Sequence, residues 1–502
     1  MNDNSDARTS RHWTAAAGLA LLLALGWAAP AHAALPAGGS GPTSDWMGTD
    51  PGSYPQTLAD VRAEIGADTG SAASLTGAGV GVALIDTGVA PVAGLPATQI
   101  VNGPDLSFES QDSDLRYLDA YGHGTHLAGI IVANDKASGS TGLAPKVKLT
   151  SIKVGTSNGA VDVTQIMAAI DWVVVHRNDD PANPIRVLNL SYGTSGGHGK
   201  SYTDPLQFAV ERAWKAGILV VAAAGNSGDN KVANPALDPY VLNVGSACTY
   251  GTRSTSDDTI STFSVINGGK RSIDVLAPGE SIESLRDPGS YVDTNYPDAR
   301  VGTTLFRGSG TSQAAAVTSA AAALLLQGRP SLSPDQAKAL LVNSAIALTG
   351  SKGYGEINVA AALAMAAPTG TQTWTASSGY GSLEDARGNS HVTRDGVLLS
   401  GDITVWGLLT TLLWVPRSLA KTAWFGGTWM GFRVAGDGWT GTSWASRTWA
   451  PAGWSFASWF GGTTSWTDPS WAGHYWSGSA WSGGDWSGHY WSGDTWSAAG
   501  WR

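Results

Sequence analysis

The sequence predicts an α/β fold, a doubly wound and mainly parallel sheet with helices on both faces. Short apolar runs, typical of strands that are buried on both sides, recur along the chain. They occupy residues 80–85, 147–154, 186–190, 218–223 and 240–244. Helical spacing fills the intervals at 124–133, 163–176 and 205–216. Strands that alternate with helices form a parallel sheet covered on both faces.

The last part of the predicted domain is helical. Residues 312–327 are apolar almost all round, which indicates a buried helix. Another helix begins at Ser333, with Pro334 in its first turn, and an Ala-rich helix ends near Pro368. We therefore expect one domain over residues 58–368. A flexible arm at 34–57, rich in Gly, Pro and Ser, precedes it, and an irregular linker at 369–423 follows it.

Composition excludes some classes of protein. Only 14% of the 502 residues are charged and the net charge is -10, which argues against nucleic acid as a partner. The single cysteine, Cys248, allows no intramolecular disulfide, and we expect it to be a small buried apolar side chain.

The first 33 residues have the pattern of a signal peptide. Arg8 and Arg11 form a basic start, and an apolar stretch runs from Ala15 to Ala29. Ala31 and Ala33 then supply the small residues that a signal peptidase reads. The sequence thus predicts secretion, with cleavage near Ala33.

Residues 424–502 form a tryptophan-rich tail. They hold 15 of the chain's 23 Trp, many of them spaced by five. A step of five aligns side chains on neither a helix nor a strand, so we expect either a repeat of short extended pieces and turns or a disordered tail. Such rings suit stacking on cell-wall sugars or a membrane interface, so the tail is a candidate for attachment to the cell envelope.

Three residues in separate motifs could carry chemistry. Asp86 follows a predicted strand in Leu84-Ile85-Asp86-Thr87-Gly88, and His123 is framed by Gly122 and Gly124. Ser312, in Gly310-Thr311-Ser312, starts the buried helix, where free N–H groups favour an oxyanion. Each alone has an ordinary reading, as a turn aspartate, a packed histidine or an N-cap serine.

Together, the order Asp, His, Ser and the glycine-framed motifs resemble the subtilisin family of serine proteases, peptidase family S8. The resemblance spans about residues 58–366. It implies that Ser312 is the nucleophile, that His123 is the general base and acid, and that Asp86 orients the imidazole. By the same resemblance, Asn226 lies where the family places its oxyanion-hole asparagine.

The resemblance also suggests where substrate binds and where metal does not. The strand end at Ser191, Tyr192 and Gly193 would pair with extended substrate, and Gly159 and Ala160 would form the opposite rim. Lys136 falls where many relatives have a calcium-binding asparagine, and a cation there opposes a calcium site. We expect no cofactor to be required. A loop with acidic side chains could hold structural calcium, although a solvated loop is the better interpretation; the side chains are Glu109, Asp112, Asp114 and Asp119.

The leading functional hypothesis is therefore a secreted serine endopeptidase that acts on polypeptides. The alternative is an envelope-attached binding or structural protein in which the tail dominates. The complete set of Asp86, His123, Ser312 and Asn226 favours the enzyme. A serine esterase would instead present Gly-x-Ser-x-Gly with the serine first in chain order, and the sequence lacks that arrangement.

Overall fold

The computed structural model describes residues 54–433, with gaps at 108, 111–114, 195–200, 229–230, 267–270, 349–350, 352–353, 389, 395–396 and 426–427, together with the pair 466–467. The expected signal peptide, most of the N-terminal arm and most of the tryptophan-rich tail lie outside the described residues. Within the described ranges, no helix combines the length and apolarity needed to cross a membrane.

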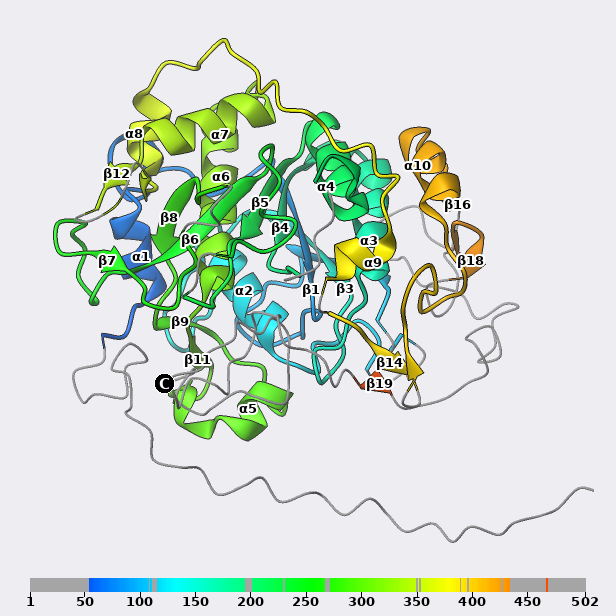
Figure 1. The fold of residues 1–502 in the computed structure, drawn as a ribbon. Coiled ribbons are helices and arrows are strands. Elements are labelled where there is room, and N and C mark those ends of the chain that lie inside the picture. Colours follow the sequence, from blue (N-terminus) through cyan, green and yellow to red (C-terminus); the bar gives the residue numbers. More distant parts are fainter. Residues whose placement is uncertain are drawn as a thin grey trace, which may run out of the picture. The chain divides into compact units, whose positions relative to one another are not determined.

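A large, mainly parallel sheet forms the centre of the fold, as the sequence predicts (Figure 1). Its strands lie in the order β12-β13-β8-β6-β5-β4-β1-β3-β2, and β7 pairs with β6. The longer strands are β1 (Gly81–Asp86), β2 (Ile100–Asp105), β3 (Lys148–Lys153), β4 (Ile185–Leu190), β5 (Leu219–Ala223), β6 (Leu242–Cys248) and β8 (Val275–Pro278). The two-residue strands are β7 (Thr259–Ile260), β12 (Ile346–Ala347) and β13 (Gly355–Glu356), and β12 and β2 lie at the two ends of the order. Within the described sheet, β7 and β12 pair antiparallel and the other neighbours pair parallel.

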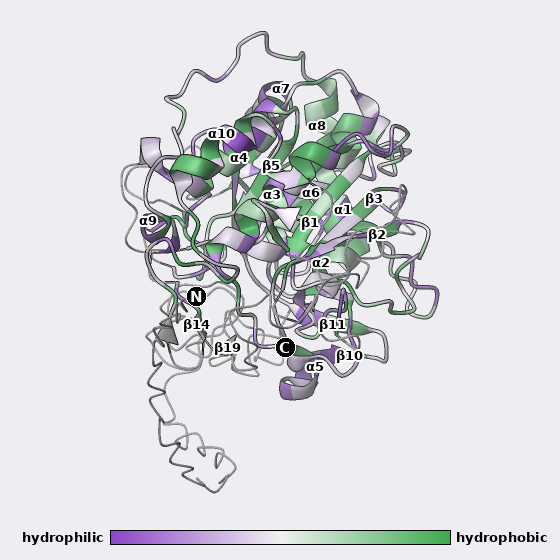
Figure 2. Cartoon of the chain, turned by 90° about the vertical axis from the view of Figure 1, so that its right-hand side faces the viewer, coloured by the Kyte–Doolittle hydropathy of each residue, from purple (hydrophilic) through white to green (hydrophobic). Residues whose placement is uncertain are grey.

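Helices cover both faces of this sheet (Figures 1 and 2). Helices α2 (His123–Val132) and α6 (Thr311–Gly328) pack together on one face, and α3 (Val163–His176) and α4 (Pro205–Lys215) on the other. Figure 2 shows β1 and β5 mainly in green, as expected for strands buried between two helical layers. The remaining helices of this part are α1 (Leu58–Glu64), α5 (Tyr291–Asn295), α7 (Pro334–Asn343), α8 (Val359–Ala364) and the short 3-10 turns η2 (Gly70–Ala72), η3 (Ser201–Thr203) and η4 (Pro297–Ala299).

Side-chain caps explain where several helices start. Asp162 accepts from the Thr164 N–H and forms a capping box with Gln165 at the start of α3. Asp204 caps α4 by accepting from the N–H groups of Leu206 and Gln207. Ser333, followed by Pro334, opens α7 with a second capping box, as the sequence indicates. A smaller antiparallel sheet of β10 (Arg300–Val301), β11 (Leu305–Gly308) and β9 (Ile282–Leu285) lies beside α2.

Residues 369–433 fold against α3 and α4, in contrast to the linker expected at 369–423 and a tail expected from Trp424. Asp171 on α3 accepts from the indole N–H groups of Trp414 and Trp429, at 2.7 and 3.0 Å, and Trp424 donates to the Ala168 carbonyl. The first tryptophans of the expected tail are therefore buried in the fold, because their N–H groups find buried acceptors. We call residues 369–433 the C-terminal extension. It contains α9 (Leu383–Arg387), α10 (Thr411–Leu419), β14 (Thr393–Arg394), β15 (Val397–Leu398), β16 (Trp424–Phe425), β17 (Thr428–Trp429) and β18 (Phe432–Arg433); β14 also pairs with β19 (Trp466–Thr467).

Cys248 lies at the end of β6 and is only partly buried. Burial, together with the nearby Glu280 carboxylate, raises the pKa of its thiol to about 12. The thiol is therefore protonated at neutral pH, which does not suit a nucleophile.

Candidate active site

The topology of the sheet places Asp86 where ligands bind in open α/β folds. Asp86 is the last residue of β1, and β1 lies between β3 and β4. The chain runs from β1 to β2 and β3 on one side and then returns to β4 on the other. The carboxyl end of β1 is thus at the point where the strand order reverses, and such points form ligand-binding crevices.

Asp86 and His123 form a buried pair. His123 is the first residue of α2, and its Nδ1 lies 3.3 Å from Asp86 Oδ1. Both residues are 1% exposed. Gly124 permits this approach, because a Cβ there would lie 2.7 Å from Asp86 Oδ1 and would overlap the Gly88 carbonyl. Glycine at position 124 therefore leaves room for Asp86 and the Gly88 carbonyl beside the start of α2.

Burial shifts the pKa values of both members of the pair. It lowers the pKa of His123 well below its usual value, and the charge of His126 acts in the same direction. It raises the pKa of Asp86, although hydrogen bonds from the Thr87 N–H and hydroxyl favour the carboxylate. A neutral imidazole is the form that accepts a proton from a nucleophile.

Asp119 and Lys153 support this pair, a role that the sequence did not predict for either residue. Asp119 accepts from the N–H groups of Gly122 and Thr125, both at 2.7 Å, and so fixes the start of α2. The Lys153 ammonium, 1% exposed, donates to the carbonyls of Thr87 and Leu118 and pairs with Glu109 at 2.9 Å. The contacts of Lys153 join segments that are distant in sequence, and those of Asp119 resemble an ordinary turn, so no local sequence motif indicates either role.

Ser312 is the second residue of α6, and Gly310 is the N-cap of that helix. The alternative of an ordinary N-cap serine therefore does not hold. Its hydroxyl is buried and makes no hydrogen bond within the described residues. Its carbonyl accepts from the Ser191 hydroxyl at 3.3 Å, so the start of α6 meets the strand end after β4.

Asn226 lies beside the start of α6 with its amide orientation fixed. Its Oδ1 accepts from both the N–H and the hydroxyl of Thr311, each at 2.7 Å. Because two donors require the oxygen there, Nδ2 faces the other way, 3.3 Å from the position that a Cβ on Gly310 would occupy. Thr311 also accepts from the Gly225 N–H and is therefore a positioning residue that the sequence did not reveal.

The expected substrate-binding residues lie at the same edge of the sheet. Ser191, Tyr192 and Gly193 follow β4 directly and are buried. Gly159 and Ala160 follow β3 in a turn in which the Ala160 N–H donates to the Thr156 hydroxyl and the Gly159 N–H to the Thr156 carbonyl. Since β3 and β4 flank β1, the two segments lie on opposite sides of Asp86.

The acidic loop is engaged within the protein as far as it is described. Glu109 pairs with Lys153, and both oxygens of Asp119 cap α2, whereas Asp112 and Asp114 lie outside the described residues. His126 points its Nε2 at the carbonyls of Ile282 and Phe306, which does not suit a metal shared with His123. Lys136 is exposed, and the absence of calcium beside it stays a prediction.

The fold is that of a subtilisin-like serine protease, and the family profile and the similar proteins agree. The subtilase family profile matches residues 77–381. Serine protease AprX of Bacillus subtilis (strain 168) is 38% identical over 278 residues, which cover 54% of this chain and 62% of AprX. Subtilisin DY of Bacillus licheniformis is 35% identical over 304 residues, 59% of this chain and 96% of that protein. A crystal structure of a cold-adapted subtilisin-like serine proteinase is 29% identical and covers 57% of this chain and 90% of its own, with a TM-score of 0.43.

The chain therefore belongs to the subtilase family, as its motifs predict. This membership indicates a serine endopeptidase with polypeptide substrates.

Proposed function

We propose that the chain is a secreted endopeptidase that cleaves peptide bonds through an acyl-enzyme on Ser312. The Ser312 hydroxyl attacks the peptide carbonyl while His123 Nε2 accepts its proton. The tetrahedral intermediate collapses, the C–N bond breaks, and His123 returns the proton to the leaving amine. Water then attacks the acyl-enzyme by the same path, which releases the acid and restores Ser312. Asp86, through Nδ1, holds the imidazole tautomer and stabilises its charged form.

The oxyanion forms beside Asn226 and the start of α6. The Asn226 Nδ2 and the Ser312 N–H are the donors that stabilise its charge. The two hydrogen bonds from Thr311 to Asn226 Oδ1 support this assignment, because they orient the amide before substrate arrives. The positive end of α6, a helix of 18 residues, adds to the field at the same point.

The observation that carries the proposal is the buried pairing of Asp86 with His123 at 3.3 Å, on a helix that packs against the helix of Ser312. The bound polypeptide would lie extended between Ser191–Gly193 and Gly159–Ala160, with its main chain paired to both. Main-chain pairing supplies affinity for many sequences, which suits an endopeptidase.

The test compares two serine variants of the full chain. Ser312→Ala should abolish peptide hydrolysis and labelling by a serine-directed phosphonate, while circular dichroism stays unchanged. Ser309→Ala is the matched control, because Ser309 lies three residues earlier, just before α6, and its hydroxyl accepts from the Ser281 N–H. Ser309→Ala should still hydrolyse peptide and still be labelled by the phosphonate. Normal turnover by Ser312→Ala would contradict the assignment of the nucleophile.

Secretion is supported by the basic start, the apolar stretch and the small residues at Ala31 and Ala33. We expect N-terminal sequencing of the exported protein to begin near Ala34. A mature start beyond about residue 75 would instead indicate a processed prosegment.

The tail suggests a second role, retention at the cell envelope. The spacing of Trp466–Trp501 in steps of five supports it, because regularly placed rings suit sugar rings or a membrane interface. Since Trp424 and Trp429 are buried in the fold, the informative truncation ends at Arg433. That truncation should keep peptide hydrolysis and shift the protein from the cell fraction to the medium. Unchanged partition excludes retention by the tail, whereas a full-length chain that binds the envelope but hydrolyses no peptide favours the alternative of an envelope-binding protein.

A further inference from the structure

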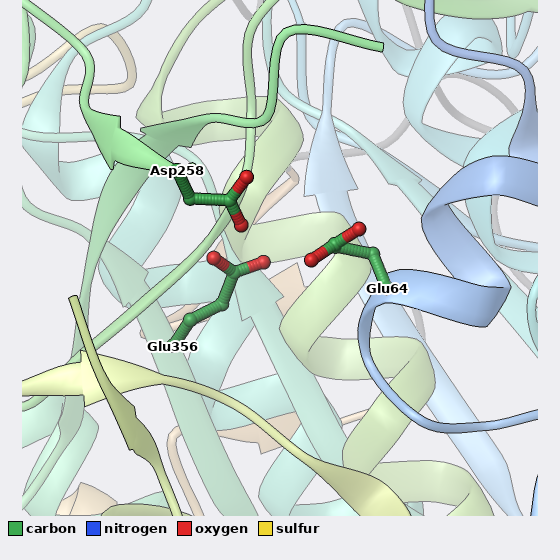
Figure 3. A group of neighbouring side chains, drawn as sticks. All are labelled: Glu64, Asp258 and Glu356. Carbon is green, nitrogen blue, oxygen red and sulfur yellow. The ribbon is translucent and has the colours of Figure 1, made fainter. Parts of the chain in front are cut away.

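Three acidic side chains outside the proposed active site meet in the interior of the protein (Figure 3). Glu64 ends α1, Asp258 directly precedes β7, and Glu356 lies on β13. They are 3%, 1% and 0% exposed, and one oxygen from each lies within 4.8 Å of the others. Figure 3 shows the carboxylates pointing toward one another.

Among the described residues, no basic side chain neutralises any of these carboxylates. All six oxygens lack a hydrogen-bond donor within the described part of the chain. No lysine, arginine or histidine of that part forms an ion pair with them. Burial, with the charge of Asp258, raises the pKa of Glu64 to about 8. Buried charges of one sign are unfavourable unless a cation or protons neutralise them.

We propose that Glu64, Asp258 and Glu356 form a buried site for a divalent cation, and that the cation is Ca²⁺. Carboxylate oxygens are the ligands that hard cations prefer. At Ca–O distances of 2.3–2.6 Å, two oxygens on one ion lie at most about 5.2 Å apart. The separation of the three ligand oxygens falls within that limit. For Mg²⁺, with bonds of about 2.0–2.1 Å, the corresponding limit is about 4.2 Å, and Mg²⁺ also requires near-octahedral geometry.

The cation ties together three segments that are distant in sequence. It links α1 to β7 and to β13 at the edge of the main sheet. Other contacts also join these segments: the Val359 N–H donates to the Ile65 carbonyl at 2.8 Å, and the exposed Arg253 pairs with Asp60. Ca²⁺ at this site therefore stabilises the folded state, because the three ligands come together only on folding.

The experiment uses the full chain with Ser312→Ala, which prevents self-cleavage, stripped of metal with a chelator. Thermal unfolding is measured without metal and with Ca²⁺ or Mg²⁺, and bound metal is counted by elemental analysis. We expect Ca²⁺ to raise Tm by several degrees and Mg²⁺ to raise it less. The variant that also carries Glu356→Gln should bind about one Ca²⁺ fewer per chain than its parent. Asp257→Asn is the matched control, because it removes an exposed charge from the neighbouring position and should keep the Ca²⁺ response.

The direction in which Glu356→Gln changes the unfolding temperature distinguishes neutralisation by a bound cation from neutralisation by shared protons. In chelator, Glu356→Gln should unfold at the same or a higher temperature than its parent, because it removes an unneutralised charge. In Ca²⁺ it should unfold at a lower temperature than its parent. If Glu356→Gln does not fold, Glu64→Gln at the end of α1 makes the same comparison. A parent that binds no Ca²⁺ and shows no shift, or a Ca²⁺ response that survives both variants, overturns the proposal.

Discussion

The guanidinium of Arg387 donates through Nε to the carboxylate of Asp162 at 2.7 Å, and both side chains are fully buried. Asp162 also caps α3, only two residues after Ala160 of the expected substrate rim. Arg387 uses its other nitrogens to donate to the carbonyls of Gly401 and Ile403. One ion pair therefore joins the C-terminal extension to the segment beside the proposed substrate site.

Removing Arg387 should strongly destabilise the fold. Arg387→Met leaves Asp162 as an unpaired buried charge, so we expect the free energy of unfolding to fall by about 3–5 kcal/mol. Urea unfolding in the Ser312→Ala background measures it. Arg417→Met is the control, because Arg417 is exposed and should change stability by no more than about 0.5 kcal/mol.

A double variant tests the reason for that loss. Asp162→Asn together with Arg387→Met removes the unpaired charge and keeps an asparagine that caps α3. The double variant should be more stable than Arg387→Met alone. If adding Asp162→Asn lowers stability further, the unpaired charge is not the cause.

The core of the fold was predictable because its signals are local. The apolar runs and helical spacing place β1, β3–β6 and α2–α4 within a few residues of their observed bounds. The strand β2, which reads Ile-Val-Asn-Gly-Pro-Asp, gives no such signal, because Gly and Pro are unfavourable in strands and its place depends on pairing with β3. The extension was not predictable, because its tryptophans are buried through acceptors on α3 that lie about 250 residues earlier.

The motifs predicted the site residues, but not the groups that hold them. Asp86, His123, Ser312 and Asn226 stand in recognisable local sequences. Thr311 and Asp119 act through hydrogen bonds to neighbours that the sequence does not distinguish from ordinary turns. The cluster of Glu64, Asp258 and Glu356 could not be predicted for a related reason, since its members are separated by about 100 to 290 residues and meet only in the folded chain.

Truncation should show that the extension belongs to the folded unit. A chain ending at Pro368 loses Arg387 and the donors that Trp414 and Trp429 provide to Asp171. Two buried carboxylates then lack partners, so we expect a loss of at least about 5 kcal/mol, or no soluble protein. A chain ending at Arg433 removes only the two-residue strand β19 among the described elements and should unfold near the temperature of the full chain. Equal unfolding temperatures for both truncations would contradict the structural role of the extension.

The oxyanion assignment predicts a loss in kcat with little change in KM. Asn226→Ala should lower kcat by roughly 100- to 1000-fold, the magnitude known for the corresponding donor in a subtilisin. Thr311→Val keeps the shape of the side chain but removes the hydroxyl that helps to orient the Asn226 amide, so its loss should be smaller. Steady-state kinetics on a peptide substrate separates kcat from KM. A rise in KM at constant kcat for Asn226→Ala would count against its role in the transition state.

Asp204 should make stability depend on pH in a direction that its burial sets. It caps α4 by accepting from the N–H groups of Leu206 and Gln207, and it also accepts from Asn234 Nδ2. Burial nevertheless raises its pKa from the ordinary value of 3.8 to about 6. The folded state therefore keeps a proton that the unfolded state has released, so this contribution to stability is full below about pH 4 and is lost as pH rises through 6.

Asp204→Asn keeps a capping side chain and removes the titration. The free energy of unfolding of the parent minus that of the variant should fall by about 3 kcal/mol between pH 3 and pH 7, since each pKa unit is worth about 1.36 kcal/mol. Urea unfolding at several pH values in the Ser312→Ala background gives this difference directly. A difference that stays constant or grows with pH would mean that the Asp204 carboxylate is stabilised in its charged form by its three donors.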